Sequence, residues 1–152
     1  MSGNIAIGIQ DFSTIIQGNY FYIDKTPFIK EWWDCGDSAT LITRPRRFGK
    51  TLTMSMVEQF FSIDYAGRSD LFEHLAIWKE EKYRELQGTY PVISLSFARI
   101  KERDYEKTKQ KMCEVLRNIY IKFCYIKDSE KLTDADRAYY ERMLEENIKI
   151  QY

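Results

Sequence analysis

Residues 44–51 read Arg-Pro-Arg-Arg-Phe-Gly-Lys-Thr and carry the residue types that bind phosphate. The run lies between a short apolar stretch, residues 39–43, and an apolar-periodic stretch that predicts a helix. A loop between a strand and a helix can point backbone N–H groups at a ligand, and the helix dipole favours negative charge there. Glycine allows close approach, lysine reaches the β- and γ-phosphates, and a threonine hydroxyl ligates Mg²⁺. The pattern predicts a nucleotide phosphate site at Gly49, Lys50 and Thr51.

The loop departs from the Walker A pattern G-x-x-x-x-G-K-[ST] in one position. Arg44 stands where the first glycine is expected, and Pro45 has no N–H and so removes one donor. The sequence after the loop supports the expected helix, because its apolar residues recur at spacings of three and four: Leu52, Met56, Phe60 and Ile63. A basic loop that only caps a helix remains the alternative to a phosphate site.

Three arginines fall within four positions of this loop: Arg44, Arg46 and Arg47. Their guanidinium groups could add charge-assisted contacts to phosphate oxygens or reach a partner subunit. They could equally lie at the edge of a sheet and pair with surface carboxylates. The sequence leaves both interpretations open.

Hydrolysis of a nucleoside triphosphate also needs a carboxylate at the end of a neighbouring strand, to hold the metal and orient water. No apolar run of this chain is followed by such an acid, and the strand expected at 91–97 continues into Ala98-Arg99. Asp24 precedes the loop, so it would lie on the base or ribose side. The sequence therefore assigns no catalytic residue.

A strand at 39–43, a helix and a strand at 91–97 form the βαβ order of an α/β fold. We expect an incomplete P-loop NTPase-like αβα sandwich with additional C-terminal helices. Residues 1–38 would be a lead-in and adenine-side segment, 39–101 the strand, loop, helix and strand, and 102–152 a helical segment. In the first segment the alternation of Ile5, Ile7 and Ile9 predicts a short strand or extended lead-in. Thr26 as N-cap and Pro27 at the first helical position predict a helix of about nine residues that ends at residues 35–37.

Within the last segment the sequence predicts two helices. The first runs from Glu102 to about Ile126, and its core-facing stripe consists of Tyr105, Thr108, Met112, Leu116, Ile119, Phe123 and Ile126. The second begins at Thr133, where Asp136 three residues on approximates a capping box.

The overall composition favours a folded, cytoplasmic domain. Hydrophobic residues make up 44% of the chain, and 23 basic residues balance 23 acidic ones, so no global charge attracts nucleic acid. No apolar stretch is long enough to span a membrane. Cys35, Cys113 and Cys124 show neither disulfide nor zinc spacing, and we expect the last two to be buried on a helix.

Four blocks of the sequence together resemble one family. They are Ile7-Gly8-Ile9 with Asp11-Phe12, then residues 19–26, 41–52 and 90–95. The set resembles the bacterial AAA-ATPase-like family, whose members often join an N-terminal ATPase-like region to a C-terminal PD-(D/E)xK nuclease-like domain. The resemblance covers essentially the whole chain. It implies that Arg44 in place of glycine is the family's own form of the loop.

The resemblance also implies which residues meet the nucleotide. Tyr22, Asp24 and Lys25 would pass beside the adenine, and Thr51 would ligate the metal. The expected cofactor-binding set is Arg46, Arg47, Phe48, Gly49, Lys50, Thr51, Leu52, Tyr22, Asp24 and Lys25. The family's metal-binding strand would lie beyond residue 152, so the chain resembles an N-terminal part without the nuclease-like domain.

The expected function is binding of ATP with Mg²⁺, as the nucleotide module of a larger ATPase and without hydrolysis by this part alone. The alternative is a degenerate domain with an interaction or regulatory role. Expected partners are the nucleotide, and either a second copy or a C-terminal nuclease-like domain. Nucleic acid would be met only indirectly. Whether ATP binds separates the two hypotheses.

Overall fold

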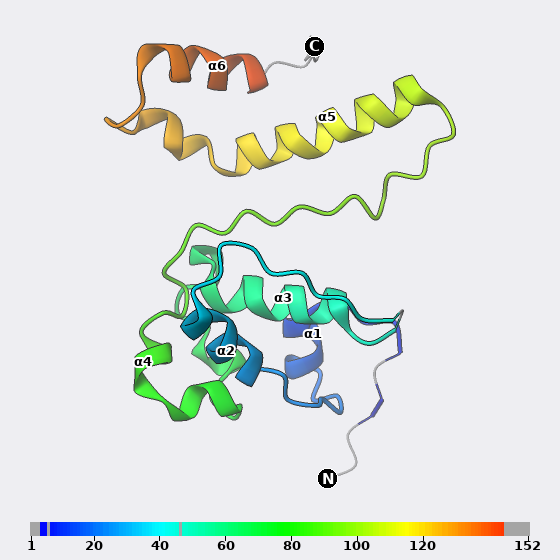
Figure 1. The fold of residues 1–152 in the computed structure, drawn as a ribbon, viewed down its shortest axis with the longest axis vertical. Coiled ribbons are helices and arrows are strands. Elements are labelled where there is room, and N and C mark those ends of the chain that lie inside the picture. The colour runs from blue at the N-terminus through cyan, green and yellow to red at the C-terminus, as the bar shows by residue number, and fades with distance from the viewer. Residues whose placement is uncertain (1–3, 6, 46, 145–152) are drawn as a thin grey trace. The chain divides into compact units, whose positions relative to one another are not determined.

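A computed structural model of the chain describes residues 4–5, 7–45 and 47–144. The chain divides into two units, Met1–Val92 and Ile93–Tyr152, which are described separately. The first unit contains α1 (Phe12–Gln17), α2 (Pro27–Cys35), α3 (Lys50–Phe61) and α4 (Glu81–Arg84), and the second α5 (Tyr105–Lys122) and α6 (Asp134–Leu144) (Figure 1). Short 3₁₀ turns link them: η1 (Ile63–Tyr65), η2 (Ser69–Leu71), η3 (Ala76–Lys79) and η4 (Cys124–Asp128).

The expected α/β sandwich is wrong. The described residues form six α-helices and no β-strand. The segments expected as strands, 39–43 and 91–97, contain no regular element, and Leu41 and Ile93 are 85% and 65% exposed. Residues 4–9, expected as a short strand or extended lead-in, likewise form no strand where they are described. β-branched and aromatic residues favour an extended backbone, but a strand also needs a neighbour that pairs with its N–H and C=O groups.

An isolated parallel β-bridge joins Ser62 and Tyr90 in the first unit. The Ile63 N–H donates to the Tyr90 carbonyl at 2.9 Å, and the Tyr90 N–H donates to the Phe61 carbonyl at 2.8 Å. The Gly88 N–H donates to the Phe60 carbonyl, also at 2.8 Å. These bonds fasten residues 88–90 to the C-terminal end of α3.

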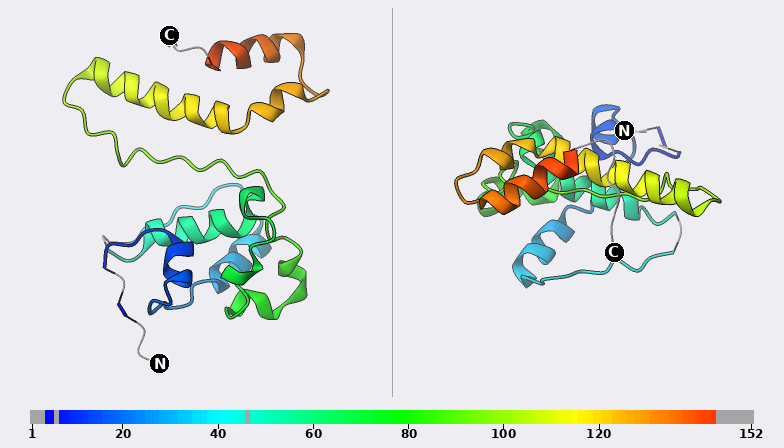
Figure 2. Two further views of the ribbon diagram at one scale, coloured as in Figure 1. Left: turned by 180° about the vertical axis from the view of Figure 1, so that it is seen from behind. Right: turned by 90° about the horizontal axis from the view of Figure 1, so that it is seen from above.

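Aromatic packing around α3 forms the core of the first unit. Met56, Phe60 and Phe61 of α3 are buried, as are Phe12 of α1 and Ile29 of α2. The helix α1 packs against α3, and both views of the first unit show the two helices adjacent (Figure 2). The helix that the sequence predicted after residue 49 is therefore confirmed, and Met56 and Phe60 of its expected apolar face are buried. Ile63, also expected on that face, lies beyond α3 in η1 and is exposed.

Local helix signals placed two further elements correctly. Thr26 and Pro27 begin α2, and Gly36 ends it in the left-handed conformation at φ 64°. At α6 the Asp136 N–H donates to the Thr133 hydroxyl, while the Asp136 carboxylate accepts from the Thr133 N–H, which is the expected capping box.

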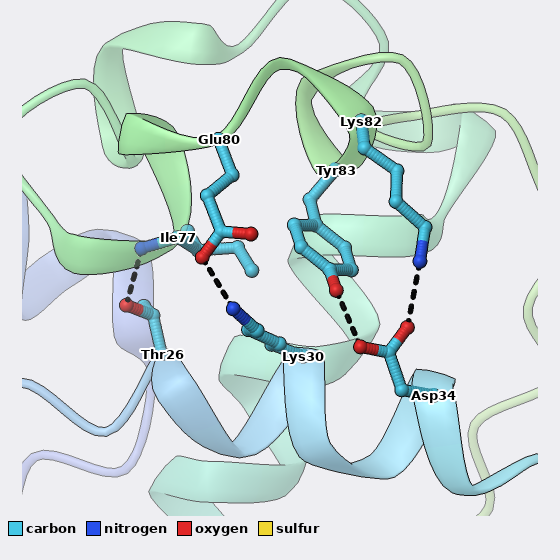
Figure 3. Close-up of polar contacts among 7 residues, drawn as sticks. All are labelled: Thr26, Lys30, Asp34, Ile77, Glu80, Lys82 and Tyr83. Carbon is cyan, nitrogen blue, oxygen red and sulfur yellow. Dashed lines mark hydrogen bonds and ion pairs between the residues drawn. The ribbon is translucent and has the colours of Figure 1, made fainter.

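Polar contacts fix α2 against the segment that contains η3 and α4 (Figure 3). The buried Tyr83 donates its hydroxyl hydrogen to the Asp34 carboxylate at 2.6 Å, and Lys82 donates to the same carboxylate at 2.8 Å. Lys30 donates to Glu80 at 2.5 Å. The hydrogen bonds from Lys82 and then Tyr83 lower the pKa of Asp34, so it stays ionised at neutral pH.

The second unit is a helix pair. The Tyr140 hydroxyl of α6 donates to the Tyr120 carbonyl of α5 at 2.7 Å, and their rings lie 4.9 Å apart. Of the expected stripe, Phe123 is buried at the end of α5, Tyr105 and Met112 are exposed, and the other members are half-buried. Cys124 is exposed, so its expected burial is wrong, and Cys113 is half-buried. No helix in the described part of the chain is long and apolar enough to cross a membrane.

Candidate functional site: a cationic pocket at the start of α3

The loop that precedes α3 has two residues in the left-handed region. Gly49 has φ 75° and is the N-cap of α3, and Arg47 has φ 69°. A glycine adopts this conformation without strain, but for arginine it costs about 1–2 kcal/mol. Strained non-glycine residues often occur at ligand-binding loops, so Arg47 draws attention to this turn.

The first turn of α3 lies at the end of this loop. The Thr53 N–H and its hydroxyl both donate to the Gly49 carbonyl, at 2.8 and 3.0 Å. The Thr53 N–H makes the first backbone hydrogen bond within the helix. The N–H groups of Lys50, Thr51 and Leu52 come before it, and in an α-helix such groups have no carbonyl partner inside the helix. An anion beside residues 49–52 would meet these donors and the positive end of the helix dipole.

A pocket of about 820 Å³ opens at this loop, within the size range of small-molecule sites. The loop and the start of α3 contribute part of the lining. The rest comes from the N-terminal segment, α1 and the residues before α2, and its apolar members, Ile5, Ile9, Ile15, Phe21 and Ile23, form what we call the apolar wall. Its lining residues are Ile5, Gly8, Ile9, Gln10, Ile15, Phe21, Tyr22, Ile23, Lys25, Arg47, Phe48, Gly49, Lys50, Thr51 and Leu52.

The charge of the lining is of one sign. Lys25, Arg47 and Lys50 contribute three cations, and no carboxylate occurs among the described residues that line the pocket. This local excess contrasts with the zero net charge of the whole chain. The pocket therefore suits an anion that also carries an apolar part.

Both lysines are bonded to carbonyl groups of the loop. The Lys50 ammonium donates to the carbonyls of Arg44 and Pro45, the latter at 3.0 Å. The Lys25 ammonium donates to the Phe48 carbonyl at 3.1 Å. Both ammonium groups thus donate to backbone carbonyls of the loop, which are neutral acceptors.

Tyr22 lies in the wall of the pocket beside Lys25. Its hydroxyl donates to the Met56 sulfur at 3.3 Å and accepts the Lys25 N–H at 3.3 Å. Burial raises the pKa of Tyr22 to about 12, so the hydroxyl remains a donor at neutral pH. Tyr22 thereby links the lysine backbone to the core beneath α3.

Asp24 lies outside this pocket and lines a neighbouring one of about 440 Å³. Its carboxylate accepts the Thr26 N–H and hydroxyl hydrogen, at 2.8 and 2.7 Å, and the Ala76 N–H at 2.8 Å. The Thr26 hydroxyl in turn accepts the Ile77 N–H at 3.1 Å. Asp24 therefore fixes the segment that carries Lys25 to η3.

Of the residues expected to bind the cofactor, the structure gathers eight around the pocket: Tyr22, Lys25, Arg47, Phe48, Gly49, Lys50, Thr51 and Leu52. Asp24 is the exception, and Arg46 lies outside the described residues. Sequence reasoning missed the apolar wall, to which Ile5, Ile9 and Ile23 contribute. The alternation of isoleucines at 5, 7 and 9 did not indicate this wall, because it places Ile7 in the same register, and Ile7 is 92% exposed and does not line the pocket.

The expected metal ligand Thr51 is exposed and lines the pocket on the first turn of α3. No group of three or more histidines, cysteines, aspartates or glutamates within the described residues could hold a metal ion. The described residues could therefore hold Mg²⁺ only if water and the oxygens of a bound phosphate supplied most of its ligands, with the Thr51 hydroxyl as the one ligand from the protein.

The comparisons with known proteins give the family. The model of a family described as "Predicted AAA-ATPase" matches residues 6–152, which is nearly the whole chain. The chain belongs to this AAA-ATPase-like family. Membership agrees with the resemblance of the four sequence blocks, and it covers every described residue of the pocket except Ile5.

A relative of this AAA-ATPase-like chain occurs in Azotobacter chroococcum mcd 1, where it is described as an uncharacterized protein in the vnfD 5' region. The two are 33% identical over 113 residues, which is 74% of this chain. The chain spans about a fifth of the length of that curated relative. No solved structure matches the chain.

Proposed function

We propose that the pocket at the start of α3 binds ATP with Mg²⁺, and that the chain is the nucleotide module of a larger ATPase. The observation that carries this proposal is the lining of the pocket, with three cations and no described carboxylate next to an apolar wall. A nucleotide has the matching halves, a polyanionic phosphate chain and a largely apolar base. Membership of an AAA-ATPase-like family supports the same ligand.

The loop and α3 would hold the phosphates. Gly49 allows the backbone to approach, the first N–H groups of α3 supply donors, and the Lys50 ammonium neutralises charge at the β- and γ-phosphates. Lys50 is now bonded to the carbonyls of Arg44 and Pro45, so it would exchange neutral acceptors for charged ones. Charge-assisted bonds are about twice as strong as neutral ones, which favours the exchange.

The apolar wall would receive the base. Phe21 and Ile23 flank Tyr22 on the segment before α2, and Ile9 lies on the N-terminal segment. The Thr51 hydroxyl would be the protein's ligand to Mg²⁺, with water and phosphate oxygens as the other ligands. The bound metal would neutralise phosphate charge, and the chain's own residues would orient the nucleotide.

Thermal unfolding with and without ATP and Mg²⁺ tests the proposal. A ligand at a hundred times its Kd stabilises the native state by about 2.7 kcal/mol, enough to raise the melting temperature by several degrees. Lys50→Ala should abolish that increase and leave the melting temperature of the free protein nearly unchanged. The control is Lys79→Ala, which removes one exposed lysine outside the pocket.

Equal melting temperatures with and without millimolar ATP would refute the proposal and favour the interaction or regulatory role. Phosphate release by residues 1–152 should stay at background, because no described carboxylate lines the pocket to position water. If residues 1–152 hydrolysed ATP steadily and Lys50→Ala abolished that activity, the expectation of background phosphate release would be wrong. The same result would still support ATP binding at this pocket.

A further inference from the structure

We propose that Lys25 is a second phosphate-binding lysine of this pocket, and that it contacts the phosphate chain of the nucleotide and not its base. The inference rests on the proposed function and adds a residue and a role to it. The sequence resemblance associates Tyr22, Asp24 and Lys25 with the adenine, whereas the position of the Lys25 ammonium favours the phosphates.

The Lys25 ammonium lies directly against the loop backbone. It is 3.1 Å from the Phe48 carbonyl oxygen, and a Cβ atom placed on Gly49 would come within 2.7 Å of it. Gly49 is the residue immediately before the first turn of α3. The ammonium therefore occupies the same corner of the pocket as the N–H groups that would bind phosphate.

The backbone that carries Lys25 is held on both sides. Its own N–H donates to the Tyr22 hydroxyl at 3.3 Å, and the neighbouring Thr26 N–H donates to the Asp24 carboxylate at 2.8 Å. Asp24 also accepts the Ala76 N–H, which ties this segment to η3. A lysine on a fixed backbone loses less conformational freedom when it binds, so it is better suited to a defined contact than a lysine on a free loop.

The present partner of the Lys25 ammonium is a neutral carbonyl. Other lysines of the first unit donate to carboxylates, Lys30 to Glu80 and Lys82 to Asp34. A phosphate oxygen is a stronger acceptor than a carbonyl for a cation. The described lining of the pocket of about 820 Å³ contains no acid, and Asp24 and Glu31 lie in the neighbouring pocket that Lys25 also lines. Arrival of a polyphosphate would therefore redirect the Lys25 ammonium by a short movement within the pocket.

Calorimetric binding of two probes to the whole chain tests this role. The probes are ATP and inorganic tripolyphosphate, each with Mg²⁺, and the variant is Lys25→Met, which keeps much of the aliphatic stem and removes the charge. One charge-assisted contact corresponds to a loss of roughly 10- to 100-fold in affinity. We expect that loss for ATP and the same loss for tripolyphosphate, which has no base.

Two further variants make the result specific. Lys79→Met removes an equal charge outside the pocket and should bind both probes like the wild type. Lys25→Arg keeps the charge and should recover most of the lost affinity. The melting temperature of each free variant shows whether the fold is retained, and Lys25→Gln replaces Lys25→Met if the latter unfolds.

The outcomes separate this inference from the proposed function. Wild-type affinity of Lys25→Met for tripolyphosphate would overturn the phosphate role, even if ATP bound more weakly, because the lysine would then act at the base or ribose. A wild-type chain that binds neither probe would refute the proposed function and this inference together. An equal loss for both probes, with recovery in Lys25→Arg, would support the inference.

Discussion

Replacement of Thr26 by valine tests the connection that holds the Lys25 segment to η3. Thr26 is completely buried, and its hydroxyl makes two hydrogen bonds, as donor to Asp24 at 2.7 Å and as acceptor from the Ile77 N–H at 3.1 Å. Valine keeps the branched shape and removes both bonds. The change therefore isolates the hydroxyl from the packing.

The two lost bonds are unequal. Asp24 is exposed and keeps two backbone donors, from Thr26 and Ala76, so its carboxylate remains largely satisfied. The Ile77 N–H belongs to a residue that is 3% exposed, and it would lose its acceptor inside the protein. A buried donor left without a partner costs about 1–3 kcal/mol. We expect Thr26→Val to destabilise the first unit by about 2 kcal/mol.

For a unit of this length that value corresponds to a decrease in melting temperature of roughly 8–16 °C, which circular dichroism measures directly. Thr26→Ser is the matched control, because it keeps the hydroxyl and removes one methyl group, at a cost of about 0.8 kcal/mol. Thr26→Val should therefore melt below Thr26→Ser. The reverse order, or a valine variant as stable as the wild type, would refute the assignment of these bonds.

Two other substitutions test the loop and the start of α1. Gly49→Ala should destabilise the free protein by about 1–2 kcal/mol because of its φ of 75°, and it should also weaken ATP binding because its Cβ displaces the Lys25 ammonium. The control Gly67→Ala has a similar φ of 77° and open space around its Cβ, so equal weakening of ATP binding by both variants would contradict this explanation. Asp11 is partly desolvated, which raises its pKa, but bonds from Ser13, Thr14 and Gln59 outweigh this and lower the pKa overall. The ionised Asp11 carboxylate therefore stabilises the fold above its unfolded pKa, near 3.8, and this stabilisation is lost as the pH falls through the lower folded pKa. The difference in melting temperature between the wild type and Asp11→Asn should thus narrow below pH 4. An unchanged difference at pH 3 would contradict the role given to these hydrogen bonds.

The elements predicted correctly from the sequence are those whose cause lies within a few residues. Pro27 starts α2 because its fixed φ suits the first helical position, and the Thr133 and Asp136 pair starts α6 through a capping box. The start of α3 is local too, because Gly49 adopts the left-handed conformation immediately before the first helical residue. Strands differ, because their stability depends on partners far along the chain. The segments 39–43 and 91–97 met the local condition and failed the pairing condition.

The candidate site was predictable in part for the same reason. The loop residues 47–52 are contiguous, so a pattern revealed them, and the structure places them around one pocket. The approach of Lys25 to the Phe48 carbonyl joins residues 23 positions apart, and no local pattern contains it. The hydrogen bond from the Ala76 N–H to the Asp24 carboxylate is likewise non-local. Asp24 lines the neighbouring pocket and not the one where the sequence placed it.

The bonds at the far end of α3 have a mechanical consequence. The helix has 12 residues and is therefore about 18 Å long, with the pocket at its first turn and the attachment of residues 88–90 at its last. Tension on the chain beyond Val92 would therefore act first on the hydrogen bonds of residues 88–90, which lie at the opposite end of α3 from the candidate pocket.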